Sequence, residues 1–334
     1  MLRPYGKFPV ISQKAKIKLI NQWFKKMEEP KSTCTKDIGG QAVIEGVMMR
    51  GARSLVVAVR KPNQEIAILR QELIPLKEKF SPFKLPILRG LATLVESLTL
   101  GIKALTYSAN VAVEEEGKEG SSKGISNFAM AITFLISIVI GIGLFVILPE
   151  RLANIISDKG YLFNIVDGII RLVVFFLYIL IISRSKQIAR VFQYHGAEHK
   201  SIHAYEAGEE LTEENAVKYS PLHPRCGTAF LLTVMVISII VFSIFGKPDS
   251  VLVRIGSRLV LIPLIAGVSY ELIKFTAKRR DHVLTKIIIA PGLWLQRLTT
   301  KEPTIDQIQV AIRSLKEVLE MESLRAESEN VASK

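Results

Sequence analysis

Residues 128–148 read FAMAITFLISIVIGIGLFVIL, a run of 21 residues without a charged side chain. A helix of this length crosses the hydrocarbon core of a bilayer. A second uncharged run covers 229–245, and two further apolar segments cover about 165–183 and about 251–270. Four buried helices of a large soluble protein are the alternative, but such helices usually keep a polar stripe. The sequence therefore predicts a mainly α, polytopic helical membrane protein with about four transmembrane helices.

The composition supports this class and excludes others. Hydrophobic residues make up 49% of the 334 residues and charged residues 22%, which excludes a disordered chain. Two cysteines, Cys34 and Cys226, are too few for a disulfide scaffold. The net charge of +13 indicates nucleic acid, an anionic membrane surface or cytoplasmic flanks of membrane spans. Because the spans account for the charge, we expect membrane lipid as a partner and no specific nucleic-acid binding.

The distribution of basic residues predicts the orientation in the membrane. Lysine and arginine are frequent in 1–36, in 183–228 and directly after the fourth segment, whereas 149–164 and 246–250 carry few. Cytoplasmic loops are enriched in basic residues. We therefore expect a multi-pass protein of the cell membrane with both termini and the 183–228 loop in the cytoplasm.

The chain is expected to divide into five parts. These are a basic amphipathic segment (1–31), a small α+β cytoplasmic domain (32–113), a linker (114–126), a membrane domain with a histidine-rich cytoplasmic loop at 184–228 (127–282), and a C-terminal amphipathic segment with a tail (283–334). Alternating apolar residues predict a β-hairpin from Leu55–Arg60 and Glu65–Leu69. A stripe at alternating steps of three and four predicts a helix over 86–112. We expect disorder after about Leu324.

The cytoplasmic domain opens with GGQAVIEGVMMRG at residues 39–51. A phosphate-binding loop is disfavoured because no Gly-Lys-Ser/Thr follows and no strand precedes the first glycine. Tight turns explain the glycines better. Glu45 and Arg50 are candidate site residues because they are charged within so apolar a stretch.

Four of the five histidines lie within 29 residues, which makes this region the strongest candidate site. The run YHGAEHKSIHAYE at 194–206 has helical character and places five polar residues on one broad face: His195, Glu198, His199, His203 and Glu206. His195 and His199 are one turn apart, so both imidazoles can reach one metal ion. His-x-x-Glu-His is also the inverted zincin pattern, with Glu198 as general base. A divalent metal, zinc in particular, with an open position for water suits hydrolysis.

A third ligand must come from outside this pair. His203 lies about 12 Å from His195 along the helix axis, and Glu206 lies farther still, so these two form an alternative pair. The remaining candidates are His223, Cys226 and Glu271, with Arg225 beside them at the start of the third span. We favour Glu271, whose carboxylate would reduce the charge of a dication site, and expect it within about 5 Å of the His195 and His199 imidazoles. His223 takes the role if it is closer.

Two other functions remain open. The histidines could be solvated or lipid-headgroup residues of a non-catalytic membrane scaffold or assembly factor that binds lipid, a protein partner or a second copy of the chain. Arg254 and Arg258 lie within the fourth apolar segment, where charge is costly unless paired, and suggest a transporter. Pairing with Asp167 or Glu150 is the simpler explanation of these arginines.

Five motifs together resemble a known family. GGQAVIEGVMMRG, YHGAEHKSIHAYEAGEELTEENA, HPRCGTAFL, PLIAGVSYELIKF and PGLWLQRLTTKEP, in this order, look like the YqhQ-like family of bacterial membrane proteins, domain of unknown function 1385. The resemblance covers about residues 36–315. It implies a membrane protein labelled as a predicted metal-dependent enzyme, a label inferred from the same histidines, and it implies no substrate.

Overall fold

The computed structural model describes residues 38–112, 127–157, 160–245, 250–278 and 282–332. The expected basic segment (1–31), the linker (114–126) and Cys34 lie outside these residues.

One antiparallel sheet forms the centre of the extramembrane part. Its strands follow the order of the chain: β1 (Gly39–Val43), β2 (Gly46–Arg50), β3 (Ser54–Arg60) and β4 (Ile66–Glu72). β3 and β4 are the predicted hairpin, which is confirmed. At the β1–β2 turn only glycine fits position 46, because a Cβ there would lie 2.2 Å from the carbonyl oxygen of Ala58. β3 is buried along nearly its whole length because helices cover both faces of the sheet.

Helices form a layer on each face of the sheet. α7 (Lys186–Glu206) and α12 (Ile305–Ala332) cover one face, and α3 (Leu88–Ala112) covers the other. The first core combines residues of the strands with Tyr194 of α7 and Ile308 and Leu315 of α12. The second joins the opposite face of the strands to Leu100 and Ala104 of α3. The cytoplasmic domain expected from 32–113 is thus completed by two helices from distant parts of the chain.

Within the residues that the structure describes, four helices are long and apolar enough to cross a membrane. The candidate spans are Ala131–Ile156, Gly160–Ile182, Gly227–Ile244 and Gly256–Thr276. They are built from α4 (Asn127–Ile142), η2 (Gly143–Ile147), α5 (Leu148–Ile156), α6 (Gly160–Ile182), α9 (Gly227–Phe245) and α10 (Val251–Lys278). The predicted fold class, a mainly α polytopic protein with a small α+β part, is confirmed.

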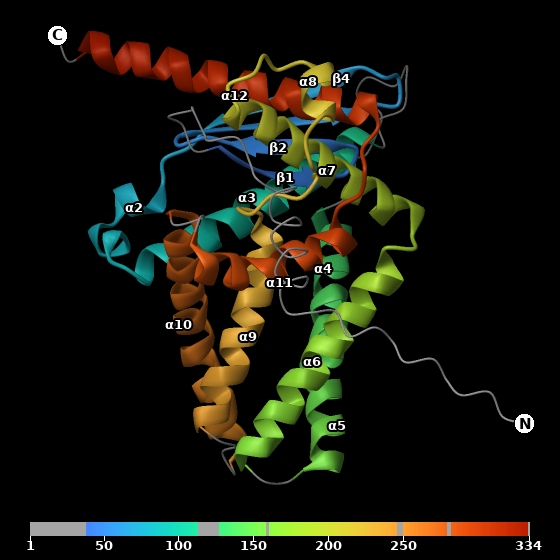
Figure 1. Cartoon of the computed structure of the whole chain (residues 1–334), viewed down its shortest axis with the longest axis vertical. Helices are drawn as coiled ribbons and strands as arrows, with labels where there is room; N and C mark the ends of the chain where they lie inside the picture. The colour runs from blue at the N-terminus through green and yellow to red at the C-terminus, as the bar shows by residue number, and fades with distance from the viewer. Residues whose placement is uncertain (1–37, 113–126, 158–159, 246–249, 279–281, 333–334) are drawn as a thin grey trace, which may run out of the picture.

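The remaining elements are short or lie between the two halves. They are α2 (Leu76–Lys79), η1 (Ser81–Lys84), α8 (Glu213–Val217) and α11 (Val283–Thr299). In Figure 1, the sheet, α3, α7, α8 and α12 gather at one end of the four spans, and α11 crosses the bundle near the upper ends of α9 and α10. The lower ends of α5 and α9 lie at the opposite end. Among the described residues, the basic loop 183–228, which carries α7 and α8, lies at the same end of the bundle as the sheet.

The C-terminal segment differs from our expectation. The prediction of disorder after about Leu324 was wrong, since α12 continues to Ala332. The helix begins at the Thr304 capping box, where the Gln307 side chain accepts a hydrogen bond from the Thr304 amide at 3.0 Å. Farther along, Glu322 accepts hydrogen bonds from the Arg53 amide at 2.9 Å and the Ser54 hydroxyl at 2.5 Å. These contacts to the sheet stabilise the last turns.

Candidate metal centre

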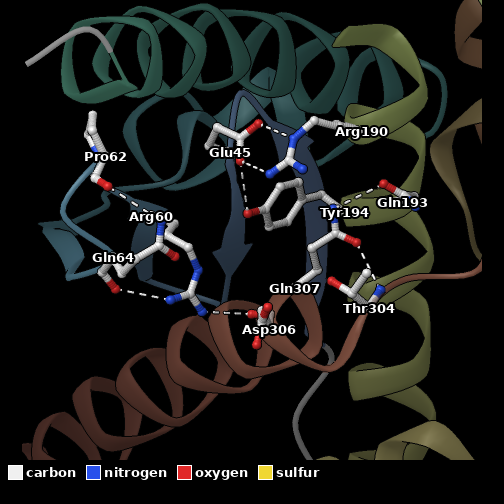
Figure 2. A network of polar contacts seen from close by, with 10 residues as sticks. All are labelled: Glu45, Arg60, Pro62, Gln64, Arg190, Gln193, Tyr194, Thr304, Asp306 and Gln307. Carbon is white, nitrogen blue, oxygen red and sulfur yellow. Dashed lines mark hydrogen bonds and ion pairs between the residues drawn. The ribbon is translucent and has the colours of Figure 1, made fainter. Parts of the chain in front are cut away.

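α7 carries most of the candidate site, and polar contacts attach its middle to the sheet and to α12 (Figure 2). Glu45, in the β1–β2 turn, forms a two-pronged ion pair with Arg190 and accepts a hydrogen bond from the Tyr194 hydroxyl at 3.4 Å. Gln193 accepts a hydrogen bond at 3.2 Å from the Gln307 amide of α12. The sequence candidate Glu45 thus fixes the rotation of α7 one turn before the predicted ligands.

Three candidate ligand side chains lie close together, two from α7 and one from the residue before α9. One ligand atom from each of His195, His199 and Cys226 lies within 4.8 Å of the other two. Nε2 of His195 is 3.1 Å from the Cys226 sulfur, and the two imidazole centroids are 4.4 Å apart. Two imidazoles and a thiolate form a donor set that suits zinc. The structure therefore contains a His-His-Cys cluster.

Hydrogen bonds orient both imidazoles toward the cluster. Nδ1 of His195 lies 2.9 Å from the carbonyl oxygen of Thr299, and Nδ1 of His199 lies 2.6 Å from that of Pro221. Because a carbonyl only accepts, Nδ1 carries the proton in each ring and Nε2 keeps its lone pair. Nε2 of His199 is buried and has no hydrogen-bond partner among the described residues. A buried nitrogen lone pair of this kind is costly unless a ligand occupies it.

The loop that presents Cys226 is itself clamped. The buried Lys200 ammonium donates hydrogen bonds to the carbonyl oxygens of Val217 at 2.9 Å and Tyr219 at 2.7 Å. Gln296 of α11 receives the His223 amide hydrogen and donates to the His223 carbonyl, both at 2.8 Å. Side chains of α7 and α11 thus hold both ends of the loop. Sequence reasoning missed Lys200 and Gln296, because nothing local indicates that these polar side chains are buried.

Burial sets the protonation of the cluster. It lowers the pKa of His199 to about 4, so the imidazole is neutral and able to bind a metal near pH 7. Burial alone would raise the pKa of the Cys226 thiol, but the neighbouring His199 and hydrogen bonds from Thr228 offset this and lower it. The thiolate is the form that binds metals.

Glu198 is buried beside the cluster and against β1. A Cβ at Gly40 would lie 2.8 Å from the Glu198 carboxyl carbon, so only glycine leaves space for this side chain. Burial raises the pKa of Glu198 to about 8, and the nearby Cys226 adds to this while His195 opposes it. A carboxyl with this pKa can take up or release a proton near neutral pH.

A second polar group adjoins the cluster. Nε2 of His223 is 3.5 Å from a carboxylate oxygen of Glu206, which also pairs with Arg225. The ring of His223 lies 5.6 Å from that of His199 and 4.6 Å from that of His203. Nδ1 of His223 accepts the Arg225 amide hydrogen at 3.2 Å, and His203 bonds to the Leu222 carbonyl. Four candidates from the sequence therefore lie beside the His-His-Cys cluster and are not part of it: His203, Glu206, His223 and Arg225.

Glu271, which we favoured as third ligand, lies elsewhere. Its carboxylate forms a two-pronged ion pair with Arg89 of α3, including a contact of 2.6 Å, and it is not part of the His-His-Cys cluster. Arg89, the second residue of α3, satisfies the Glu271 carboxylate without a metal. Arg50 likewise pairs with Glu96 at 2.7 Å, at the opposite face of the sheet. The residue that lies with His195 and His199 is Cys226, another of the candidates from the sequence.

Comparison with known proteins identifies the family of the chain. The family described as Protein of unknown function (DUF1385) matches residues 85–321. The chain is 35% identical over 309 residues to the protein described as "Uncharacterized protein YqhQ" of Bacillus subtilis (strain 168), covering 87% of this chain and 95% of that protein. No solved structure matches the chain. The family match covers more than half of the chain, which therefore belongs to the DUF1385 family.

Proposed function

We propose that the protein is a metal-dependent hydrolase that acts at the cytoplasmic face of the membrane. The observation that carries this proposal is the convergence of His195, His199 and Cys226 within 4.8 Å, with a buried His199 nitrogen that lacks a hydrogen-bond partner among the described residues. Three protein ligands with a fourth position left for water are typical of catalytic zinc sites, whereas structural sites use four.

The residues fit a divalent metal, and zinc in particular. His195 and His199 would bind through Nε2 and Cys226 through its thiolate, while carbonyl groups hold the opposite ring nitrogens. A bound zinc ion would supply Lewis-acid activation of water and of the bond to be hydrolysed. Glu198 would accept a proton from the attacking water and deliver it to the leaving group, since its carboxyl is buried next to the ligands.

The cytoplasmic assignment rests on charge. The site lies at the end of the bundle where the sheet and α12 gather, and the basic loop 183–228 joins α6 to α9 at this end. Basic loops stay on the cytoplasmic side. The cytosol is also reducing, which keeps Cys226 available as a thiolate.

Metal content of the purified full-length protein tests the proposal. We expect about one zinc per chain for the wild type and for Glu198→Gln, and loss of zinc in His199→Ala. A hydrolytic activity found by screening model esters, phosphoesters and amides should disappear in both variants. Glu198→Gln would then lose activity with its metal retained, which separates the proton-transfer role from metal binding. A wild type that binds no divalent metal would instead support the non-catalytic scaffold.

A further inference from the structure

The His-His-Cys cluster lies next to the start of a candidate membrane span. Cys226 directly precedes α9, whose span begins at Gly227. A Cβ at Gly292 of α11 would lie 2.5 Å from the Ala229 Cβ in the first turn of that span. The cluster and α11 therefore lie at the level of the first turn of the α9 candidate span.

α11 has two different faces. One face is buried and supports the site: Gln296 holds His223, and the Thr299 carbonyl holds His195. The other face is exposed and carries apolar side chains, with Ile287 61%, Ile288 42% and Trp294 52% accessible, and the exposed Arg297 lies beside Trp294 near the end of the helix.

The exposed face of α11 continues the apolar surface of a span. The Trp294 ring packs edge-on against Phe176 of α6, with centroids 5.4 Å apart. The neighbouring α6 residues Val173 and Leu177 are each 52% exposed, as lipid-facing residues are. Tryptophan is enriched where a span meets the headgroups. An amphipathic helix of this kind lies in the membrane interface with its apolar face in the acyl chains.

The site is closed on the side away from the membrane. His199 is buried, and the carboxyl of Glu198 lies against Gly40 of the sheet. Among the three cluster residues, His195 is partly exposed, and it lies next to α11, whose Thr299 carbonyl accepts its hydrogen bond. One helix diameter, about 10 Å, separates the lipid-facing side of α11 from the side that holds the site.

We infer that the substrate is a membrane lipid whose hydrolysable bond lies at the level of the headgroup, and that it reaches the site along α11 from the bilayer. This inference rests on the proposed function for the hydrolysis, but the location of α11 and the access of lipid can be measured without any turnover.

The first measurement uses Trp294 as a native probe. The chain has two tryptophans, so Trp23→Phe leaves Trp294 alone. In nanodiscs we expect phosphatidylcholine brominated near the headgroup end of its chains to remove most of the Trp294 emission, and aqueous iodide to have little effect. The matched control moves the probe to α12 (Trp23→Phe, Trp294→Phe, Ile305→Trp), where iodide should quench and bromolipid should not. Iodide quenching of Trp294 without bromolipid quenching would overturn the inference.

The second measurement asks whether lipid reaches the metal. Cobalt(II) is added to the protein in nanodiscs, and the phosphorus-31 relaxation of the lipid headgroups is compared between the wild type and Cys226→Ser. We expect faster relaxation that depends on the cysteine. A thiolate-to-cobalt absorption band without any effect on phosphorus would overturn lipid access while leaving the metal site intact. Absence of that band would overturn the metal site itself, and the Trp294 result would still report the position of α11.

Discussion

Two polar regions of the molecule differ in the kind of side chains that they bring together. The His-His-Cys cluster brings together His195, His199 and Cys226, whose donor atoms all point at one place. The second region lies among the spans, where Asp167 pairs with Arg171 at 2.8 Å and with Arg258 at 3.9 Å.

The difference lies in how each region satisfies its polar groups. The intramembrane region combines opposite charges, and Arg258 also reaches Glu150 at 3.7 Å, so the α5, α6 and α10 helices are tied together by mutual neutralisation. The cluster contains no such balance: its ligands are lone pairs aimed at one point. A charge network of the first kind stabilises a fold, whereas convergence of the second kind is the arrangement that our proposed metal site requires. The pairing of Arg258 therefore favours a structural role for it over transport.

Removal of one proposed ligand should reduce metal affinity, and we expect this to be the largest effect of any substitution. His199→Ala deletes a ligand atom, so metal affinity should fall by more than the roughly 10- to 100-fold that loss of an outer-shell partner causes. His203→Gln is the matched control on the same helix, because its amide can still donate to the Leu222 carbonyl. Isothermal titration with zinc measures both. Equal losses of zinc affinity in the two variants would contradict the assignment of His199, and not His203, as a metal ligand.

Breaking the charge network should affect stability and not metal. Arg258→Gln removes partners of Asp167 and Glu150, and we expect a loss of up to about 3 kcal/mol, since Asp167 keeps Arg171. Thermal unfolding in detergent measures the loss, and the exposed Arg184→Gln serves as control. Zinc content should stay at the wild-type level. Lost zinc with unchanged unfolding temperature would reverse the roles of the two regions.

Glu198 predicts a pH dependence of the metal-free protein. Its pKa is about 8 in the folded state against an ordinary 4.5, so between these values the folded protein holds a proton that the unfolded chain has released. Stability should therefore be greatest at the low end of this window and fall as pH rises through it. Glu198→Gln cannot titrate and should show a smaller fall. Urea unfolding at pH 6 and pH 8 gives the free energy of unfolding of both proteins. If this free energy falls by the same amount from pH 6 to pH 8 in the wild type and in Glu198→Gln, the burial of this carboxyl is contradicted.

The smallest effect is expected at the turn that positions α7. Glu45 has a backbone φ of 51°, a conformation that glycine adopts without strain. Glu45→Ala loses the contacts to Arg190 and Tyr194 and keeps the strain, so we expect a loss of about 1 kcal/mol. Glu45→Gly loses the same contacts but relieves the strain, and should be closer to the wild type. Differential scanning fluorimetry separates the two, and a more damaging glycine would contradict this explanation.

Hydropathy, charge and helical phase predicted much of this molecule. The four apolar segments, the hairpin of β3 and β4, and the helix that carries His195 and His199 all follow from local patterns. The partners of these elements do not. We expected Glu271 at the cluster because a carboxylate would reduce the charge of a dication site. In the structure this carboxylate forms an ion pair with Arg89 of α3 instead. Cys226 was one candidate among several, and only the clamped loop between α8 and α9 brings its sulfur to His195.

Zinc-edge X-ray absorption of the zinc-loaded full-length protein tests the His-His-Cys site, because the spectrum reports which atoms bind the metal. We expect one sulfur at about 2.3 Å, two imidazole nitrogens at about 2.0 Å and one further light atom. Cys226→Ser should lose the sulfur and keep the imidazole scattering. A wild-type shell of oxygen and nitrogen alone, without sulfur, would contradict the His195, His199 and Cys226 site.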